Sequence, residues 1–325
     1  MRRTTPRVIC PALSYLDESD FRSCLKHASA YGDGADTLFI LGSTGEDEYI
    51  SLPEKKRLID IGVDEVRNLK SIISSNPDCD LTILKLKLKL AVGITGNNVA
   101  ESIELAQYAE RAGADYCVLI PLQINKNSLG NVTRRGVRET ALKVIDATEE
   151  IHFMVYNAPW RTENKNLRTN IWKELATHPR IDAVKDSSGD VTRFHNYERA
   201  RHSNAEAFMG DAIKSLTLAN LDGVVAGPLN VLPAAWTVAI RRETYLDVQI
   251  PYHTCKLLTG LDPIIRGNYV GFFKYVLEKK FVVTPSEPLD PKNVVSTEQQ
   301  VEFDKILASE NFETLWEMNF RQPRD

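Results

Sequence analysis

Residues 181–190 read IDAVKDSSGD, in which a short apolar run ends at Lys185 and passes into a polar turn. A lysine at the carboxyl end of a buried strand loses hydration, and burial disfavours its charged form. A neutral amine can attack a ketone and form a Schiff base. A lysine at a strand end more often points into water, so its neighbours in the fold decide between the two interpretations.

A second apolar run stands at 151–155 and leads into Tyr156 and the rest of YNAP, 29 positions before the lysine (185 − 156). This interval is about one strand-helix-strand unit. Tyr156 and Lys185 are therefore expected side by side at the same rim of a parallel sheet.

The same alternation of strand-like and helical segments runs from near residue 8 to about residue 235. Strands are expected at 8–12, 37–41, 88–93, 116–121, 152–156, 183–185, 207–209 and 223–226. Helices are expected at 20–31, 52–69, 98–112, 134–148, 167–177, 191–201 and 213–221. Eight strands with helices between them predict an α/β fold of the closed (β/α)8 TIM barrel type. No GxGxxG follows the first strand, which disfavours a dinucleotide-binding fold.

Beyond residue 235 the alternation ends. Residues 236–278 have helical character with interruptions at Pro251 and Pro263, and 298–320 carry a final amphipathic pattern. We expect a barrel over 1–235 that carries the active site and a helical C-terminal subdomain over 236–325 packed beside it. Leucine and lysine alternate over 81–90 as in a half-exposed strand, so Lys85 and Lys87 are expected before its buried part.

The composition excludes several classes of protein. The 325 residues are 43% hydrophobic and 26% charged, with a formal net charge of −4, which argues against a nucleic-acid partner. No uncharged apolar run approaches the ~20 residues of a membrane span, and no apolar segment follows Met1-Arg2-Arg3 as in a secretory signal. The five cysteines form no CxxC pair and the six histidines no HExxH motif. A soluble cytoplasmic protein with reduced thiols and no metal site is expected.

A glycine-rich turn, LGSTGE at 41–46, follows the second expected strand. Barrel enzymes build their sites at this end of the strands. The backbone N–H groups and the Ser43 and Thr44 hydroxyls of such a turn can converge on a carboxylate. A capped glycine turn is common, so the motif gains weight only together with Tyr156 and Lys185.

These motifs together resemble those of the dihydrodipicolinate synthase / N-acetylneuraminate lyase family of class I, pyruvate-dependent aldolases. The family is a TIM barrel with a GxTGE loop after strand two, a YNxP segment ending strand five and a Schiff-base lysine ending strand six. Here these are GSTGE at 42–46, YNAP at 156–159 and VKDSSGD at 184–190, with AERAGAD at 109–115 and GD at 210–211 as further matches. The resemblance extends from about residue 8 to 280.

The resemblance implies a role for each matching residue. Lys185 would form an imine with C2 of pyruvate or another 2-oxo acid, and Tyr156 and Thr44 would complete the catalytic set. No metal or organic cofactor is implied, because the protonated imine is itself the electron sink. The positions implied to bind substrate are Gly42, Ser43, Thr44, Gly45, Arg161, Gly210, Asp211 and Val225.

Some positions depart from the family pattern. Arg161 matches the arginine that dihydrodipicolinate synthases use to hold the carboxylate of the second substrate, a task that suits a guanidinium. Where the synthases have adjacent tyrosines, this chain has Leu122 and Gln123. The acidic residue with which sialic acid lyases bind sugar hydroxyls falls on Ala212 or Ile213.

Four functions remain open from the sequence. The first is a class I lyase that forms or cleaves a C–C bond between pyruvate and an aldehyde. The second is 4-hydroxy-tetrahydrodipicolinate (dihydrodipicolinate) synthase, which condenses pyruvate with aspartate semialdehyde. The third is a 2-keto-3-deoxy sugar acid dehydratase, and the fourth a catalytically silent homologue that binds a 2-oxo acid. The expected partners are small molecules and further copies of the chain, as a homo-oligomer (tetramer or dimer).

Overall fold

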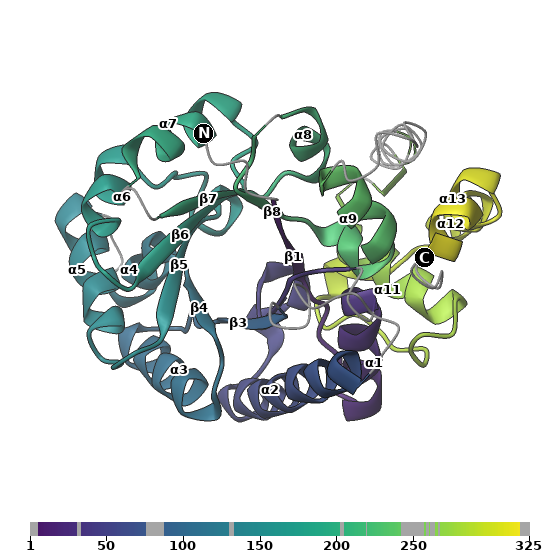
Figure 1. Ribbon diagram of the computed structural model, residues 1–325, viewed down its shortest axis with the longest axis horizontal. Coiled ribbons are helices and arrows are strands. Elements are labelled where there is room, and N and C mark those ends of the chain that lie inside the picture. The colour runs from purple at the N-terminus through teal and green to yellow at the C-terminus, as the bar shows by residue number, and fades with distance from the viewer. Residues whose placement is uncertain are drawn as a thin grey trace.

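A computed structural model describes residues 6–30, 34–75, 88–129, 133–201, 205–218, 220–241, 257, 260, 264–265 and 267–318. Eight parallel strands close into a barrel in the order of the chain, and the helices surround it (Figure 1). The strands are β1 (Arg7–Pro11), β2 (Thr37–Ile40), β3 (Lys89–Gly93), β4 (Tyr116–Leu119), β5 (His152–Asn157), β6 (Ile181–Asp186), β7 (Glu206–Met209) and β8 (Gly223–Val225). The predicted (β/α)8 fold is confirmed.

Apolar side chains fill the molecule in two layers, as the alternation of side chains along a barrel strand requires. Ile9 points inside the barrel, whereas its neighbours Val8 and Cys10 belong to the larger core between strands and helices. The inner layer also holds Tyr156 and Val225, and all its members are almost fully buried. The barrel interior is therefore a packed core, and chemistry is confined to its rims.

The helices of the barrel follow the strands in sequence, and several of them begin at a polar cap. Asp17 caps α1, Asn98 caps α3, Thr133 caps α5 and Asp190 caps α7, each accepting a hydrogen bond from a backbone N–H of the first turn. The helices are α1 (Glu18–Ser29), α2 (Leu52–Ser75), α3 (Val99–Ala112), α4 (Pro121–Leu129), α5 (Arg134–Ile145), α6 (Thr169–Leu175), α7 (Val191–Ala200), α8 (Ala212–Thr217) and α9 (Pro233–Arg241).

One helix of the barrel, α4, was not predicted. The strand expected to run to residue 121 ends at Leu119, and α4 begins at Pro121. Proline suits the first position of a helix, where its missing N–H needs no partner. The predicted boundary at residue 235 also falls inside α9, which packs on β1 and α1, so the barrel extends to Arg241.

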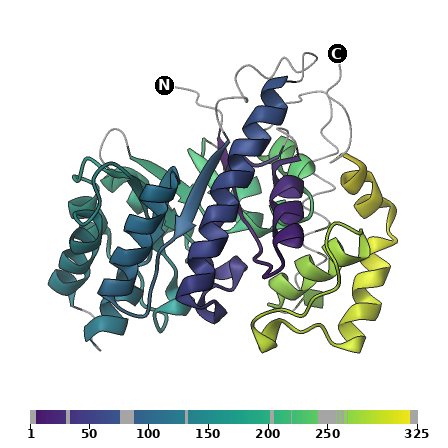
Figure 2. The same ribbon diagram turned by 90° about the horizontal axis from the view of Figure 1, so that it is seen from below.

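The C-terminal helices lie beside α1 at one side of the barrel (Figure 2). They are α11 (Tyr269–Lys279), α12 (Thr297–Leu307) and α13 (Glu310–Glu317), so the single amphipathic pattern over 298–320 forms two helices. The buried Asp20 of α1 accepts hydrogen bonds from the backbone and hydroxyl of Thr284, and His27 stacks on Trp316 at 5.1 Å. Pro251, Pro263, Lys85 and Lys87 lie outside the described residues.

None of the helices in the described part of the chain combines the length and apolar character that crossing a bilayer requires.

Candidate active site

Lys185 lies at the carboxyl end of β6 and is only 5% exposed. Its Nζ lies 3.9 Å from the centre of the Tyr156 ring and 5.2 Å from that of Phe39. Burial, and to a lesser extent the positive charge of Arg161, together lower the pKa of the Lys185 amine to about 7. A substantial fraction of this amine is therefore neutral near pH 7, which is the state that attacks a carbonyl.

Tyr156 is paired with Lys185 in the register of β5 and β6, as the 29-residue interval predicts. Burial raises the pKa of the Tyr156 phenol to about 12, against the opposing effects of a hydrogen bond with Ser187, the charge of Arg161 and a hydrogen bond with Ser43. The phenol therefore stays protonated and can donate a proton beside the amine. Trp160 lies edge-on to this ring, 6.2 Å away, and is 54% exposed at the mouth of the site.

The GSTGE loop forms a short 3-10 helix, Ser43–Gly45, directly after β2. A Cβ on Gly45 would lie 2.8 Å from the Ser14 hydroxyl and 3.0 Å from the Ala12 carbonyl, and a Cβ on Gly42 would lie 2.8 Å from the Phe39 ring. The two glycines thus let the loop pack closely on the segment that follows β1 and on Phe39, whose ring faces the Lys185 amine. Ser43 and Thr44 are half-buried, and their role as carboxylate ligands stays a prediction.

Arg161 contacts carboxylates of this chain. It lies in the short helix Pro159–Arg161, and its Nη1 and Nη2 donate to the two carboxylate oxygens of Asp47 at 2.7 and 3.0 Å. Nη1 also donates to the Ser43 hydroxyl at 3.3 Å, and Nη2 lies 3.0 Å from a Glu48 oxygen. The Arg161 and Asp47 side chains are 5% and 4% exposed, so their charges are shielded from water.

The sequence prediction missed Asp47 and Glu48. They directly follow the GSTGE motif, and two acidic residues there were a signal that a nearby cation would be neutralised. Nothing in the local sequence links them to Arg161, which is 114 positions away from Asp47.

Ser187 is a further missed residue, and Gly210 makes room for it. A Cβ on Gly210 would lie 1.9 Å from the Ser187 hydroxyl, the group that hydrogen-bonds to Tyr156. Gly210 also donates its backbone N–H to the Asp186 carbonyl at 2.7 Å. The structure therefore supports a positioning role for Gly210, while contact with substrate stays a prediction.

Asp211 and Val225 have structural partners of their own. Asp211 caps α8 by accepting from the Lys214 N–H and lies 3.4 Å from the Lys214 ammonium. Val225 ends β8 and is 2% exposed inside the barrel. Their contacts with substrate stay predictions.

Asp186 joins the ends of β5 and β6. Its carboxylate accepts from the Asn157 amide at 2.7 Å and from the Ser188 N–H at 3.0 Å, and Asn157 in turn accepts from the Leu167 N–H. Burial raises the pKa of Asp186 above its ordinary value. This network fixes the strand ends that carry Tyr156 and Lys185.

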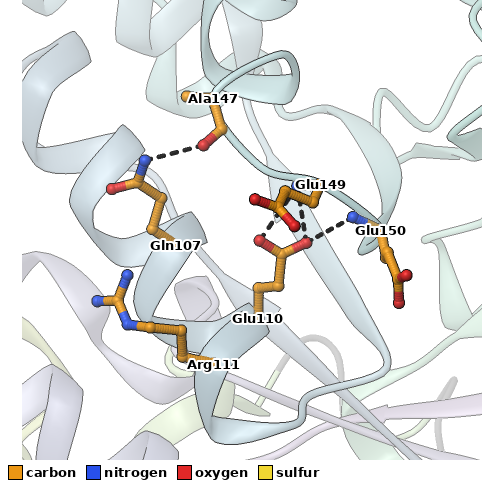
Figure 3. A pocket seen from close by; sticks show the side chains of 6 residues that line it. All are labelled: Gln107, Glu110, Arg111, Ala147, Glu149 and Glu150. Atoms are coloured by element: carbon orange, nitrogen blue, oxygen red, sulfur yellow. Dashed lines mark hydrogen bonds between the residues drawn. The ribbon is translucent and has the colours of Figure 1, made fainter.

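A surface pocket lies near the amino end of β5 (Figure 3), whereas Lys185 lies at the carboxyl end of β6. Within it Glu110 accepts hydrogen bonds from the backbone N–H groups of residues 149–151, which holds the turn before β5. None of the predicted site residues lines it. Its lining residues are Gln107, Glu110, Arg111, Ala147, Glu149 and Glu150.

Within the described ranges, no group of three or more histidine, cysteine, aspartate or glutamate side chains is arranged to hold a metal ion.

The sequence matches the model of the Dihydrodipicolinate synthetase family over residues 79–310. A 4-hydroxy-tetrahydrodipicolinate synthase from Salinibacter ruber is 26% identical over 325 aligned positions, which cover 94% of this chain and 96% of that protein. The enzyme of the same name from Herminiimonas arsenicoxydans is 26% identical over 203 positions, and this chain spans only 61% of its length.

Solved structures share the fold at lower identity. The crystal structure of KD(P)GA from T. tenax has a TM-score of 0.71 and 22% identity, covering 92% of this chain and 98% of that one. At this identity the match is evidence for the barrel fold alone.

Proposed function

The chain belongs to the dihydrodipicolinate synthetase family, and from this membership we propose that it is a class I lyase that forms or cleaves the C–C bond between pyruvate and an aldehyde through a Schiff base on Lys185. The observation that carries the proposal is the buried Lys185 amine, with a pKa lowered to about 7, beside the ring of Tyr156. Few structural roles favour a lysine in that state, because burial of an amine without a carboxylate partner destabilises a protein.

In the proposed reaction the neutral amine of Lys185 attacks C2 of pyruvate and forms a carbinolamine. The protonated Tyr156 donates a proton to the departing hydroxyl, water leaves, and a positively charged imine remains. The Ser43 and Thr44 hydroxyls and the amides of the GSTGE loop hold the pyruvate carboxylate, and the backbone near Val225 helps to orient the imine.

The imine then acts as the electron sink. The Tyr156 phenolate left by the dehydration step takes a proton from C3 to give an enamine, whose carbon attacks the aldehyde, and the re-formed Tyr156 phenol gives its proton to the new alkoxide. Hydrolysis of the imine releases the product and restores the amine. Cleavage follows the same steps in reverse, and no metal or organic cofactor is needed for the electron flow.

A synthase that condenses pyruvate with aspartate semialdehyde is the second candidate, supported by the names of the relatives and by Arg161. It is opposed by Leu122 and Gln123 in place of the tyrosine pair, and by the carboxylate of Asp47 on the guanidinium. A 2-keto-3-deoxy sugar acid dehydratase and a silent 2-oxo-acid-binding homologue remain third and fourth.

We also propose that the protein acts in the cytoplasm as a homo-oligomer. The cysteines Cys10, Cys24 and Cys117 are free and buried, which suits a reducing compartment. The oligomer is proposed from the family resemblance.

The proposal is tested by trapping with borohydride. Pyruvate and borohydride together are expected to add one reduced pyruvyl group to the peptide that contains Lys185. Lys185→Arg keeps a positive charge but forms no imine, and should remain unlabelled. Lys55→Arg is the matched control, because Lys55 is also a buried lysine but lies on α2. Labelling of Lys185→Arg at another lysine would contradict the mechanism, and trapping without turnover of any aldehyde would favour the silent homologue.

A further inference from the structure

We infer that Asp47 determines acceptor specificity: by occupying the guanidinium of Arg161, it excludes aldehydes that end in a carboxylate and favours uncharged, hydroxyl-bearing ones. The inference rests on the proposed lyase function and deepens it by naming the class of the second substrate.

The hydrogen-bonding capacity of Arg161 carries the first step. A guanidinium has four N–H bonds on its terminal nitrogens and one on Nε. Four oxygens of this chain contact the terminal nitrogens: both from Asp47, one from Ser43 and one from Glu48. Only the Nε of Arg161, which is buried, has no hydrogen-bond partner in the described structure. A bidentate grip on a substrate carboxylate requires two free N–H groups, so Asp47 or Glu48 would have to leave first.

Arg161, Asp47 and Glu48 form a charged cluster, and its net charge opposes the approach of a further carboxylate. One guanidinium faces two carboxylates, Asp47 and Glu48, so the cluster as a whole is negative by one unit. The Asp47–Arg161 pair is almost fully buried, and the excess negative charge is on Glu48, whose side chain is 56% exposed. A second carboxylate brought to this place would be repelled, whereas a hydroxyl would not.

The cluster also lies beside a hydrogen-bond acceptor that has no donor within the described part of the chain, the side-chain carbonyl of Gln123. Gln123 stands beside it and donates its side-chain amide to Glu48 at 2.8 Å. Its carbonyl oxygen is buried and has no hydrogen-bond partner among the described residues, an arrangement that is unfavourable until a donor arrives. Alcohol groups supply such donors, and a carboxylate does not.

The cluster is close enough to the reacting atoms to act on the acceptor. Arg161 changes the titration of both Lys185 and Tyr156 through its charge, and Ser43 contacts Tyr156 as well as Arg161. An aldehyde that approaches the enamine on Lys185 therefore has its far end near Asp47, Glu48 and Gln123.

The test compares three acceptors with pyruvate: glyceraldehyde, succinic semialdehyde and the methyl ester of succinic semialdehyde. The native enzyme should show a kcat/KM at least tenfold higher for glyceraldehyde than for succinic semialdehyde, and the ester should exceed the free acid. Asp47→Ala should raise kcat/KM for succinic semialdehyde at least tenfold. Asp47→Asn, which keeps the shape and decides the matter if Asp47→Ala does not fold, should raise it in the same direction.

The double variant Asp47→Ala/Arg161→Ala is the matched control. The gain for succinic semialdehyde relative to glyceraldehyde must disappear in it, because the gain is attributed to the freed guanidinium and the ratio cancels the general effect of Arg161 on Lys185. A gain that persists in the double variant, equal use of the acid and glyceraldehyde by the native enzyme, or turnover of neither would overturn the inference. Trapping of pyruvate on Lys185 is measured in every variant, because its failure in the native protein would instead contradict the proposed function.

Discussion

At the scale of single residues, the charge state of Lys185 sets the expected pH dependence. The attacking amine must be neutral, and its pKa in the folded protein is about 7. The rate of borohydride trapping at low pyruvate should therefore rise about tenfold per pH unit below pH 7 and level off above it. A midpoint near the ordinary lysine value would show that the amine is solvated, and would contradict the assignment.

The Arg161→Ala variant tests whether the charge of Arg161 contributes to the low pKa of Lys185. That positive charge is the second contribution that lowers the pKa of Lys185. Arg161→Ala should therefore raise that pKa. The rising part of the curve of trapping rate against pH should move to higher pH, and trapping at pH 7 should be slower. Arg57→Ala is the control, since Arg57 lies on α2 and pairs with Glu54 at 2.9 Å. An unchanged pH dependence of trapping in Arg161→Ala would show that Arg161 does not influence the pKa of Lys185.

The Tyr156→Phe variant tests the role of Tyr156 in proton transfer separately from imine formation on Lys185. The protonated phenol of Tyr156 hydrogen-bonds with Ser43 and Ser187 and should donate during carbinolamine collapse and C–C bond chemistry. Tyr156→Phe should lower kcat for the aldol reaction on the order of 100-fold or more, the usual contribution of a general acid. Slow trapping of pyruvate should persist, because the Lys185 amine is intact. Unchanged kcat would assign the proton transfer to another group.

The sequence predicted some of these residues and missed others for a physical reason. Tyr156 and Lys185 were predicted together because one strand-helix-strand unit fixes their relative position. Asp47 and Ser187 were missed because their roles depend on partners that only the closed barrel brings near. The ion pair of Arg161 with Asp47 therefore could not be predicted, and the substrate-binding role expected of Arg161 stays a prediction.

At the scale of secondary structure, strands were more predictable than helices. All eight strands lie within two residues of their expected bounds, because buried parallel strands are short continuous apolar runs between polar turns. Helix α2 continues to Ser75, six residues beyond its expected end, and α4 was not predicted, its first residue Pro121 having been placed at the end of the preceding strand. The apolar segment around Ile120 suits either state, and only packing in the barrel decides between them.

The turn after β7 allows a prediction at this scale. Gly210→Ala would place a Cβ 1.9 Å from the Ser187 hydroxyl, so Ser187 must move away from Tyr156. We expect a fall in kcat of about tenfold or more, with pyruvate trapping retained. Gly260→Ala is the control, because no described atom lies within 4 Å of a Cβ built at Gly260. Replacing Ser187 by alanine in the Gly210→Ala background should relieve the clash without restoring kcat; full restoration would show that the Ser187 hydrogen bond is dispensable.

At the scale of the whole molecule, one buried ion pair connects the active-site loop to the C-terminal helices. Glu46, the last residue of GSTGE, accepts from Lys274 of α11 at 2.7 Å, and both side chains are at most 5% exposed. Glu46 also accepts from the backbone N–H groups of Leu289 and Asp290 and from the Asn293 amide. The C-terminal segment therefore holds the backbone of the loop that is proposed to bind the pyruvate carboxylate.

Lys274→Met tests this connection. It leaves the buried Glu46 carboxylate without its cation, which should lower the free energy of unfolding by about 3–5 kcal/mol. Because Glu46 adjoins Gly45, the KM for pyruvate should also rise, although Lys274 lies on a helix outside the barrel. Lys305→Met is the matched control: Lys305 pairs with Glu302 on the exposed face of α12, and such a pair contributes about 0–1 kcal/mol. The double variant Glu46→Gln/Lys274→Met should be more stable than the sum of the single losses predicts, since it removes the unpaired charge. A loss of stability in Lys274→Met with an unchanged KM would mean that the ion pair stabilises the fold without positioning the loop, whereas a raised KM would show that the C-terminal helices are part of the pyruvate site.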